Sequence, residues 1–250
     1  MAAVIETAAI VLHAFDYRET SRIVRLATRE SGVISAIAKG ARRPKSRFGQ
    51  GLDLFTSGTA LVALHQSGDL HTLAGFDASR ARPALAQSLR RFGAAAALAE
   101  VCLRFGTEAT AGVHDALSAG LDRIGASADP DVPAATLAAA WRIVGELGFA
   151  PALESCALCQ RELQPDEDVR FSHRSGGAVC HGCRSLVPGA RSLPASARVT
   201  LVDWMAGSEV PLHDAPTARA HQRLLREFLE EHLGDGRAFP AFQSWERLDS

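Results

Sequence analysis

The sequence lacks the long apolar segments that a membrane helix needs. It has 250 residues, 47% of them hydrophobic, but no apolar run approaches the ~20 residues required to cross a bilayer. The first residues, Met1–Glu6, have no basic region, and an acid interrupts their short apolar run, unlike a secretory signal peptide. These absences favour a cytoplasmic protein without a membrane partner, in which cysteine thiols stay reduced.

The sequence also lacks the short motifs of the common catalytic sites. It contains no H-E-x-x-H, G-x-S-x-G or G-x-G-x-x-G pattern. Gly40 precedes Lys45 and Ser46 at a spacing similar to that of a phosphate loop. However, Pro44 stands where such a loop needs its second glycine, and proline has no N–H to offer a phosphate. Three polar groups fit ordinary surface positions: His213, Asp214 and His221. We therefore expect a protein that is not an enzyme and does not bind ATP.

A strong overall charge is absent as well, since the formal net charge is −1. The local distribution is more informative, because no acid occurs between Glu30 and Asp53. Five cations fall within nine residues of that interval: Lys39, Arg42, Arg43, Lys45 and Arg47. Such a segment is either a solvated loop or a surface that neutralises phosphates. Phe48 and Phe55 could add a stacking face for an unpaired base, and we favour nucleic-acid binding.

Cysteine is scarce, but four of the five cysteines form a metal-binding pattern. Cys156 and Cys159 form one C-x2-C pair, and Cys180 and Cys183 form another after a gap of twenty residues. Four converging thiolates suit a closed tetrahedral zinc site, which is structural and not catalytic. Two disulfides or a redox pair are less favoured alternatives, and His181 could replace one thiol. The fifth cysteine, Cys102, is expected to be a buried, inert thiol.

The N-terminal third predicts a small β-barrel. Short runs rich in β-branched residues, separated by Gly, Asp and Ser, occur at 8–15, 21–28, 33–38, 59–64 and 70–76. Five strands in about 75 residues match the size of an OB-fold barrel. We therefore assign residues 1–80 to an OB-fold domain that binds nucleic acid.

The remainder, residues 81–250, predicts a helical domain with an inserted metal module. Apolar residues at three- and four-residue steps indicate helices, over 84–106, 114–125, 134–147, 195–206 and 215–233. The cysteine pairs interrupt this pattern at about 153–186. The fold class is thus α+β and multidomain, with an N-terminal OB-fold β-barrel and a central and C-terminal α-helical domain that carries a four-cysteine zinc-binding insertion.

Several segments resemble the bacterial recombination mediator family RecO. They begin with Asp16–Val24 and Thr28–Gly32, and continue with Ala38–Phe48, Gly68–Leu73, Leu147–Pro151 and the two cysteine pairs. The similarity extends over roughly residues 5 to 190, in the same order and spacing. It is most specific in the block Lys39–Ser46 and in the cysteine frame. One departure is Gln160, where many relatives have glycine directly after the second cysteine.

The resemblance implies binding of single- and double-stranded DNA and ATP-independent annealing of complementary strands. It also implies a complex with RecR that helps load the RecA recombinase onto DNA coated by single-strand-binding protein, hence roles in DNA repair and recombination in the RecF pathway. The basic residues named above carry over as DNA contacts, with Arg18, Arg22 and Arg25 as weaker candidates. The four cysteines carry over as ligands of a structural Zn²⁺. Relatives that lack these cysteines indicate that zinc serves stability.

The acidic, apolar C-terminal tail of single-strand-binding protein would need an apolar cleft with a basic rim. Four arginines of the predicted helices could supply that rim: Arg90, Arg91, Arg104 and Arg123. They could equally be ordinary helix-surface residues. Two other classes of protein also remain open, an RNA-binding module built from the barrel and the zinc insertion, and an adaptor whose barrel binds protein.

Overall fold

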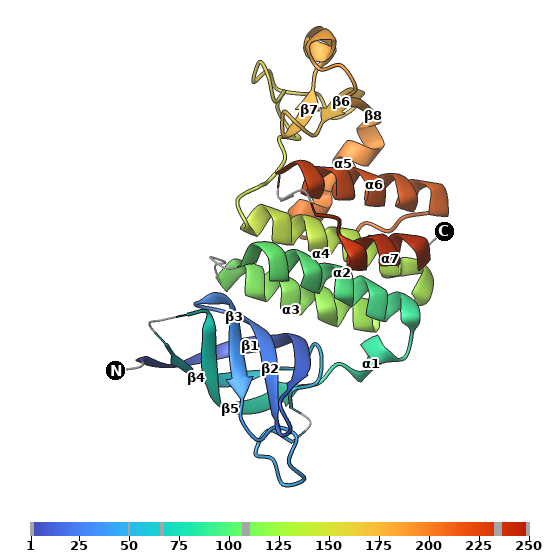
Figure 1. The fold of residues 1–250 in the computed structure, drawn as a ribbon. Coiled ribbons are helices and arrows are strands. Elements are labelled where there is room, and N and C mark those ends of the chain that lie inside the picture. Colours follow the sequence, from blue (N-terminus) through green and yellow to red (C-terminus); the bar gives the residue numbers. More distant parts are fainter. Residues whose placement is uncertain (1–2, 50, 66–67, 107–110, 233–236, 249–250) are drawn as a thin grey trace.

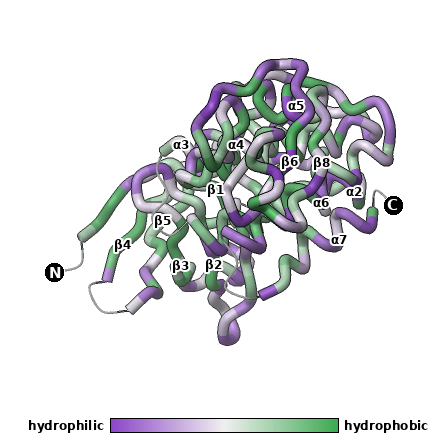
Figure 2. Tube along the Cα trace, turned by 90° about the horizontal axis from the view of Figure 1, so that it is seen from above, coloured by the Kyte–Doolittle hydropathy of each residue, from purple (hydrophilic) through white to green (hydrophobic). Residues whose placement is uncertain are grey.

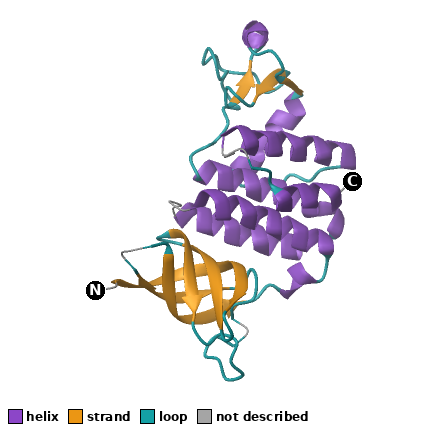
Figure 3. Ribbon diagram, viewed as in Figure 1, coloured by secondary structure: helices purple, strands orange, loops and turns teal. Residues whose placement is uncertain are grey.

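The N-terminal domain of the computed structural model is a closed five-stranded barrel (Figures 1 and 3). The structure describes residues 3–49, 51–65, 68–106, 111–232 and 237–248, so the outermost residues of the two predicted domains lie outside it. The strands are β1 (Ala3–Tyr17), β2 (Ser21–Thr28), β3 (Gly32–Ala38), β4 (Ser57–Leu64) and β5 (Leu70–Arg80). Their order around the barrel is β1-β2-β3-β5-β4, in which only β3 and β5 run parallel. The predicted OB-like barrel is confirmed.

The length of β1 explains how the barrel closes. Its N-terminal half pairs with β4, from Ala3 opposite Leu64 onward, and its C-terminal half pairs with β2 as far as Tyr17 opposite Ser21. A bulge between Val11 and His13 lets the strand bend between its two partners. Hydrophobic and hydrophilic residues are mixed along these strands (Figure 2). One set of buried residues, including Ala9 and Val11, fills the barrel, whereas Ile10 and Leu12 of the same strand belong to the helical core.

The rest of the chain is a stack of helices. They are α1 (Pro83–Ala86), α2 (Leu89–Phe105), α3 (Ala111–Ala126), α4 (Val132–Glu146), α5 (Ala195–Met205), α6 (Ala215–His232) and α7 (Pro240–Leu248). A short 3-10 helix, Asp129–Asp131, precedes α4. The final residue of the predicted helix 215–233 lies outside the described residues. Within the described part of the chain, no helix combines the length and apolar character needed to span a bilayer.

Two helix predictions need correction. The predicted helix 84–106 is broken, because Ser88 adopts an extended backbone and its hydroxyl accepts a hydrogen bond from the N–H of Arg91, which starts α2. Helix α7 has no counterpart among the predicted helices. It has nine residues, and its stability comes from Phe242 and Trp245, which are fully buried, so tertiary packing and not propensity determines it.

The helical core is built around close packing of α3 on α4 and large aromatic side chains beside them. A Cβ on Gly120 would lie 2.6 Å from the Cβ of Ala139, so only glycine permits this approach of the two helices. Trp141 packs on Phe228 with ring centroids 5.2 Å apart. The expectation of a surface position for His221 is wrong, since it is buried against Trp204 and burial lowers its pKa to about 4.

The metal module projects from the end of the helical stack opposite the barrel (Figures 1 and 3). It contains a three-stranded sheet of β6 (Val169–Ser172), β7 (Gly177–Val179) and β8 (Arg191–Leu193), and a 3-10 helix, His181–Leu186. Its sheet therefore extends beyond the range 153–186. A Cβ on Gly177 would lie 2.3 Å from the carbonyl oxygen of Ala152, so glycine is required where these two segments meet.

Arginines join the barrel to the helices. Arg25 of β2 donates to the carbonyl of Leu103 on α2 at 3.0 Å. Arg82, with a nearly buried side chain, pairs with Asp122 on α3 at 2.8 Å and also donates to the carbonyl of Phe55. These bonds fix the orientation of the barrel relative to α2 and α3.

Candidate metal centre and nucleic-acid interface

The four predicted ligands converge on one point. The Sγ atoms of Cys156, Cys159, Cys180 and Cys183 all lie within 4.8 Å of one another, and those of Cys159 and Cys180 are 3.8 Å apart. Sulfurs bound tetrahedrally at about 2.3 Å from a zinc ion would also be about 3.8 Å apart. The cluster can therefore hold a metal ion of this size.

Local backbone bonds shape the two turns that carry these cysteines. In the first turn, the N–H of Cys156 donates to the carbonyl of Arg161 at 2.8 Å, and the N–H of Gln160 donates back to Cys156 at 2.9 Å. Gln160 has a φ of +59°, the left-handed conformation that glycine adopts most readily. In the second turn, Cys183 donates to the carbonyl of Cys180 at 3.1 Å. The first cysteine turn thus forms with a glutamine directly after its second cysteine.

The electrostatic surroundings of the thiols are unequal. Burial acts to raise the pKa of Cys156, but hydrogen bonds from the N–H of Cys180 and of two further turn residues bring it to about 6. The pKa of Cys180 is lowered as well: burial opposes this, but the N–H of Cys183 and the Arg161 side chain favour the thiolate. The pKa of Cys183 is raised to about 12, first by its hydrogen bond with Cys159 and then by burial. Binding of a cation would therefore displace protons from some of the thiols.

Two further residues considered in the sequence, His181 and Cys102, lie outside the thiol cluster. His181 is exposed, and its Nδ1 lies 3.3 Å from the Arg184 guanidinium, so it is not part of the thiol cluster. Cys102 is buried in α2, far along the chain from the cluster, and burial raises its pKa to about 12. The prediction that this thiol is buried is confirmed, and its inertness stays a prediction.

The basic segment is a loop of successive turns between β3 and β4. Its internal backbone hydrogen bonds join residues three apart in the chain. The N–H groups of Arg43, Ser46 and Gly49 each donate to the carbonyl three residues earlier, at 2.9–3.2 Å. The structure places all five predicted cations on the exposed surface of this loop: Lys39, Arg42, Arg43, Lys45 and Arg47. The loop extends from the end of the barrel that faces away from the helices (Figure 1).

An acid from the neighbouring hairpin lies against this loop. Asp16 on β1 forms ion pairs with Arg42 at 3.3 Å and with Arg22 at 3.2 Å. The N–H of Arg42 also donates to the carbonyl of Thr20, at 3.0 Å. These bonds attach the loop to the β1–β2 turn. Arg18 is exposed in that turn, with its guanidinium 5.2 Å from the ring centre of Tyr17.

The proposed aromatic stacking face is wrong. Phe48 has 4% of its surface exposed and belongs to the barrel core, and Phe55 has 3% exposed and packs edge-on against Phe92 of α2. Neither ring can stack on a base. Arg25 is also misplaced as a DNA contact, because it bonds α2 and burial lowers its pKa.

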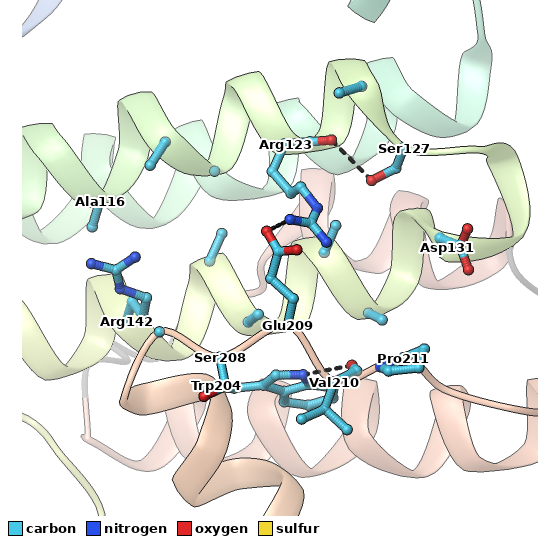
Figure 4. A pocket seen from close by; sticks show the side chains of 18 of the residues that line it. Ala116, Arg123, Ser127, Asp131, Arg142, Trp204, Ser208, Glu209, Val210 and Pro211 are labelled. Carbon is cyan, nitrogen blue, oxygen red and sulfur yellow. Dashed lines mark hydrogen bonds and ion pairs between the residues drawn. The ribbon is translucent and has the colours of Figure 1, made fainter.

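A third feature is a groove of about 640 Å³ between α3, α4 and the segment that follows α5 (Figure 4). Its floor is lined mainly by alanines of α3 and α4, and Arg123 and Arg142 lie at its edges. Arg123 forms an ion pair with Glu209. Trp204 donates its ring N–H to the carbonyl of Val210 at 2.9 Å, which fixes the far wall.

Only one of the four predicted rim arginines lines this groove, so the shared rim is wrong. Arg90 donates to the carbonyl of Leu248 at 3.2 Å, and Arg91 donates to that of Ser127 at 2.9 Å. Arg104 donates to the carbonyl of Ala238 and lies 4.1 Å from the ring centre of Phe239. These three side chains hold helices and loops together. Sequence periodicity places arginines on helices but cannot identify the carbonyls that they bond.

Comparison with known proteins extends over nearly the whole chain. Residues 1–82 match the family described as "Recombination protein O N terminal", and residues 86–238 match "Recombination protein O C terminal". The DNA repair protein RecO of Anaeromyxobacter dehalogenans strain 2CP-C is 34% identical over 232 residues, which is 90% of each chain. That of Myxococcus xanthus strain DK1622 is 31% identical over 229 residues, or 90% of this chain and 91% of the relative. The barrel, the helical domain and these matches together show that the chain belongs to the recombination protein O family.

Proposed function

We propose that this protein is a mediator of DNA repair and homologous recombination that binds single- and double-stranded DNA and anneals complementary strands without ATP. In this proposal it works with RecR to load RecA onto DNA coated by single-strand-binding protein, in the cytoplasm and in association with the nucleoid. The observation that carries the proposal is the loop 39–47, whose five cations are all exposed at one end of an OB-like barrel. Family membership supports it.

The proposed reaction needs no covalent chemistry, and the protein is proposed not to be an enzyme. Two strands anneal faster when cations offset the repulsion between their phosphates and the base edges stay accessible. The loop offers cations. Phe48 is buried in the barrel core, and Phe55 is buried against Phe92 of α2. DNA held in this way is bound by its backbone and not by stacking, so its bases remain free to pair.

The test is charge reversal of the loop in Lys39→Glu/Arg42→Glu/Arg43→Glu. Each single-strand phosphate contact contributes about 0.7 to the slope of log affinity against log salt, so loss of three contacts lowers that slope by about 2. We expect the affinity for a labelled strand to fall at least tenfold at low salt. Reversal of three exposed arginines of the metal module, Arg170, Arg174 and Arg184, is the control with the same charge change. Full binding by the loop variant would refute the assignment.

We propose that the metal is Zn²⁺ and that its role is structural. Four thiolates fill a tetrahedral site and leave no position for a substrate. The spacing of the sulfurs supports zinc. Metal content of the purified protein, measured by elemental analysis, tests this proposal, and one zinc per chain is expected.

We further propose that the groove between α3 and α4 binds the C-terminal tail of single-strand-binding protein. The groove has an apolar floor with Arg123 and Arg142 at its edges, and an acidic, apolar peptide would compete with Glu209 for Arg123. In Arg123→Ala/Arg142→Ala, the affinity for a tail peptide should fall about tenfold while binding of bare DNA stays unchanged, because an ion pair in a partly enclosed groove contributes more than a fully exposed one. Unchanged peptide affinity would remove the groove from the proposal.

A further inference from the structure

A second cleft, of about 340 Å³, lies between α6 and α7. Its described lining consists of four arginines, two glutamines and one glutamate: Arg219, Gln222, Arg223, Arg226, Gln243, Glu246 and Arg247. Three of the arginines follow one face of α6 at steps of four and three residues. The fourth lies on α7, which packs across from them.

The charges of the lining residues sum to an excess of positive charge. Arg226 is half-buried and pairs with Glu246 at 3.1 Å and with Glu230 at 3.1 Å. The four arginines of the lining outnumber these two acids. Arg219, Arg223 and Arg247 have exposed side chains. Arg226 thus joins α6 to α7, and the other three arginines lie on the exposed surface around the cleft.

The composition of the lining identifies the occupant. All of the described lining residues are polar or charged, whereas the groove between α3 and α4 has an alanine floor. A peptide that carries apolar anchors fits the alanine-floored groove and has nothing to bury in the arginine cleft. Guanidinium groups bind phosphate oxygens in a bidentate manner, and glutamine amides can donate to the same oxygens.

The spacing of the arginines also matches a phosphate chain. Residues 219 to 226 of a helix extend over about 10 Å at 1.5 Å per residue. One strand of B-form DNA carries about three phosphates over that distance, since its phosphates follow every 3.4 Å along the axis. Arg219 and Arg223 are the exposed members of this row on α6, and Arg247 adds a third exposed cation from α7. These three side chains can therefore contact neighbouring phosphates of one strand.

We propose that the cleft between α6 and α7 binds the sugar–phosphate backbone of a nucleic acid, as a contact separate from the loop 39–47. This inference rests on the proposed function in that DNA binding supplies the ligand. The cleft and the loop lie apart in the molecule. The cleft is next to α7, which packs on α2, whereas the loop extends from the end of the barrel that faces away from the helices (Figure 1). A long strand can extend over both surfaces, or each surface can hold one of two strands.

The test uses the full chain with Arg219→Gln/Arg223→Gln/Arg247→Gln, in which glutamine keeps helix propensity and removes charge. The control removes the same charge from the metal module, as Arg170→Gln/Arg174→Gln/Arg184→Gln. Affinity for a long labelled single strand is measured between about 50 and 200 mM salt. We expect the cleft variant to bind at least fivefold more weakly at the lower salt, with a slope reduced by about 2, and the control to match the unmodified protein. Arg223→Gln alone should lower the slope of log affinity against log salt by about 0.7. This single variant replaces the triple variant in the test if the triple variant does not fold.

Three outcomes would overturn the proposal, and they differ from one another. If the cleft variant binds DNA like the unmodified protein while the loop variant does not, the cleft has no role in DNA binding and the proposed function stands. If the cleft variant loses affinity for polyglutamate but not for DNA, the cleft binds an acidic protein segment. If the unmodified protein binds no DNA at low salt, the proposed function fails together with the cleft.

Discussion

The thiol cluster and the basic loop differ in the direction in which their functional side chains point. In the metal module, the thiols of four cysteines point toward one another, and backbone bonds of the two turns hold them within 4.8 Å. In the loop, five cations point outward, and only Arg42 is held by an ion pair to a neighbouring strand among the bonds described. The first arrangement organises the protein itself, whereas the second is available to a partner.

This difference predicts that the two regions affect separate properties. A change in the thiol cluster should alter stability, because metal binding and folding are coupled. A change in the loop should alter DNA affinity and its dependence on salt, because exposed charges contribute little to stability. Variants that mix the two effects would contradict the separation.

The largest effect is expected for Cys156→Ser. Zinc bound to small structural sites contributes about 10–16 kcal/mol to their folding, so loss of a buried ligand should lower the free energy of unfolding by about 3 kcal/mol or more. Thermal unfolding and zinc content would show the loss together. Affinity for DNA, measured well below the melting temperature, should change less than twofold.

Cys102→Ser is the matched control for that variant. Cys102 is fully buried but lies outside the thiol cluster. Burial of a hydroxyl there costs about 1–3 kcal/mol, but the zinc content should remain complete. A metal-free Cys156→Ser protein with an unchanged melting curve would show that the module does not depend on its metal.

A smaller effect, of opposite sign, is expected for Gln160→Gly. Gln160 has a φ of +59° in the first cysteine turn, and a residue with a Cβ in this conformation costs about 1–2 kcal/mol. Glycine should raise the free energy of unfolding by about 1 kcal/mol and the melting temperature by about 2–4 °C. The mirror control is Gly189→Ala, at a φ of +84° with open space around the position, which should lose stability. A Gln160→Gly protein that melts earlier would contradict this reading of the turn.

The smallest effect is expected for Asp16→Asn. Asp16 pairs with both Arg42 and Arg22, and its carboxylate also repels phosphates near the loop. Removal of this charge should increase DNA affinity about twofold to threefold at low salt, a change within the range of exposed ion pairs. The gain should vanish at high salt, where exposed charges are screened. Weaker binding would mean that Asp16 orients Arg42 for DNA.

Much of the fold could be predicted from the sequence because local patterns specify it. The five strands and five of the helices follow from alternation and from three- and four-residue spacing, and the cysteine spacing indicates one converging site. Helix α7 could not be predicted in this way, because its two buried aromatic residues stabilise it only once the helix packs against α2.

The surface sites were harder to predict, since they depend on tertiary structure. Phe48 directly follows Arg47, the last cation of the loop, yet its ring is buried in the barrel. The alanine-floored groove is formed by the consecutive helices α3 and α4 together with residues 207–211, which lie far from both in the chain. Arg123 reaches it, whereas Arg104 has the same character in sequence but bonds a carbonyl elsewhere. A charge pattern identifies an available surface but not its boundaries.

The most direct test of the central claim is strand annealing without ATP. Two complementary labelled strands are mixed with the unmodified protein, with the loop reversal Lys39→Glu/Arg42→Glu/Arg43→Glu, and with Cys156→Ser below its melting temperature. The account predicts that the unmodified protein accelerates annealing, that the acceleration fades as salt rises, that the loop variant loses it and that Cys156→Ser keeps it. Equal acceleration by the loop variant, or none by the unmodified protein, would contradict the account.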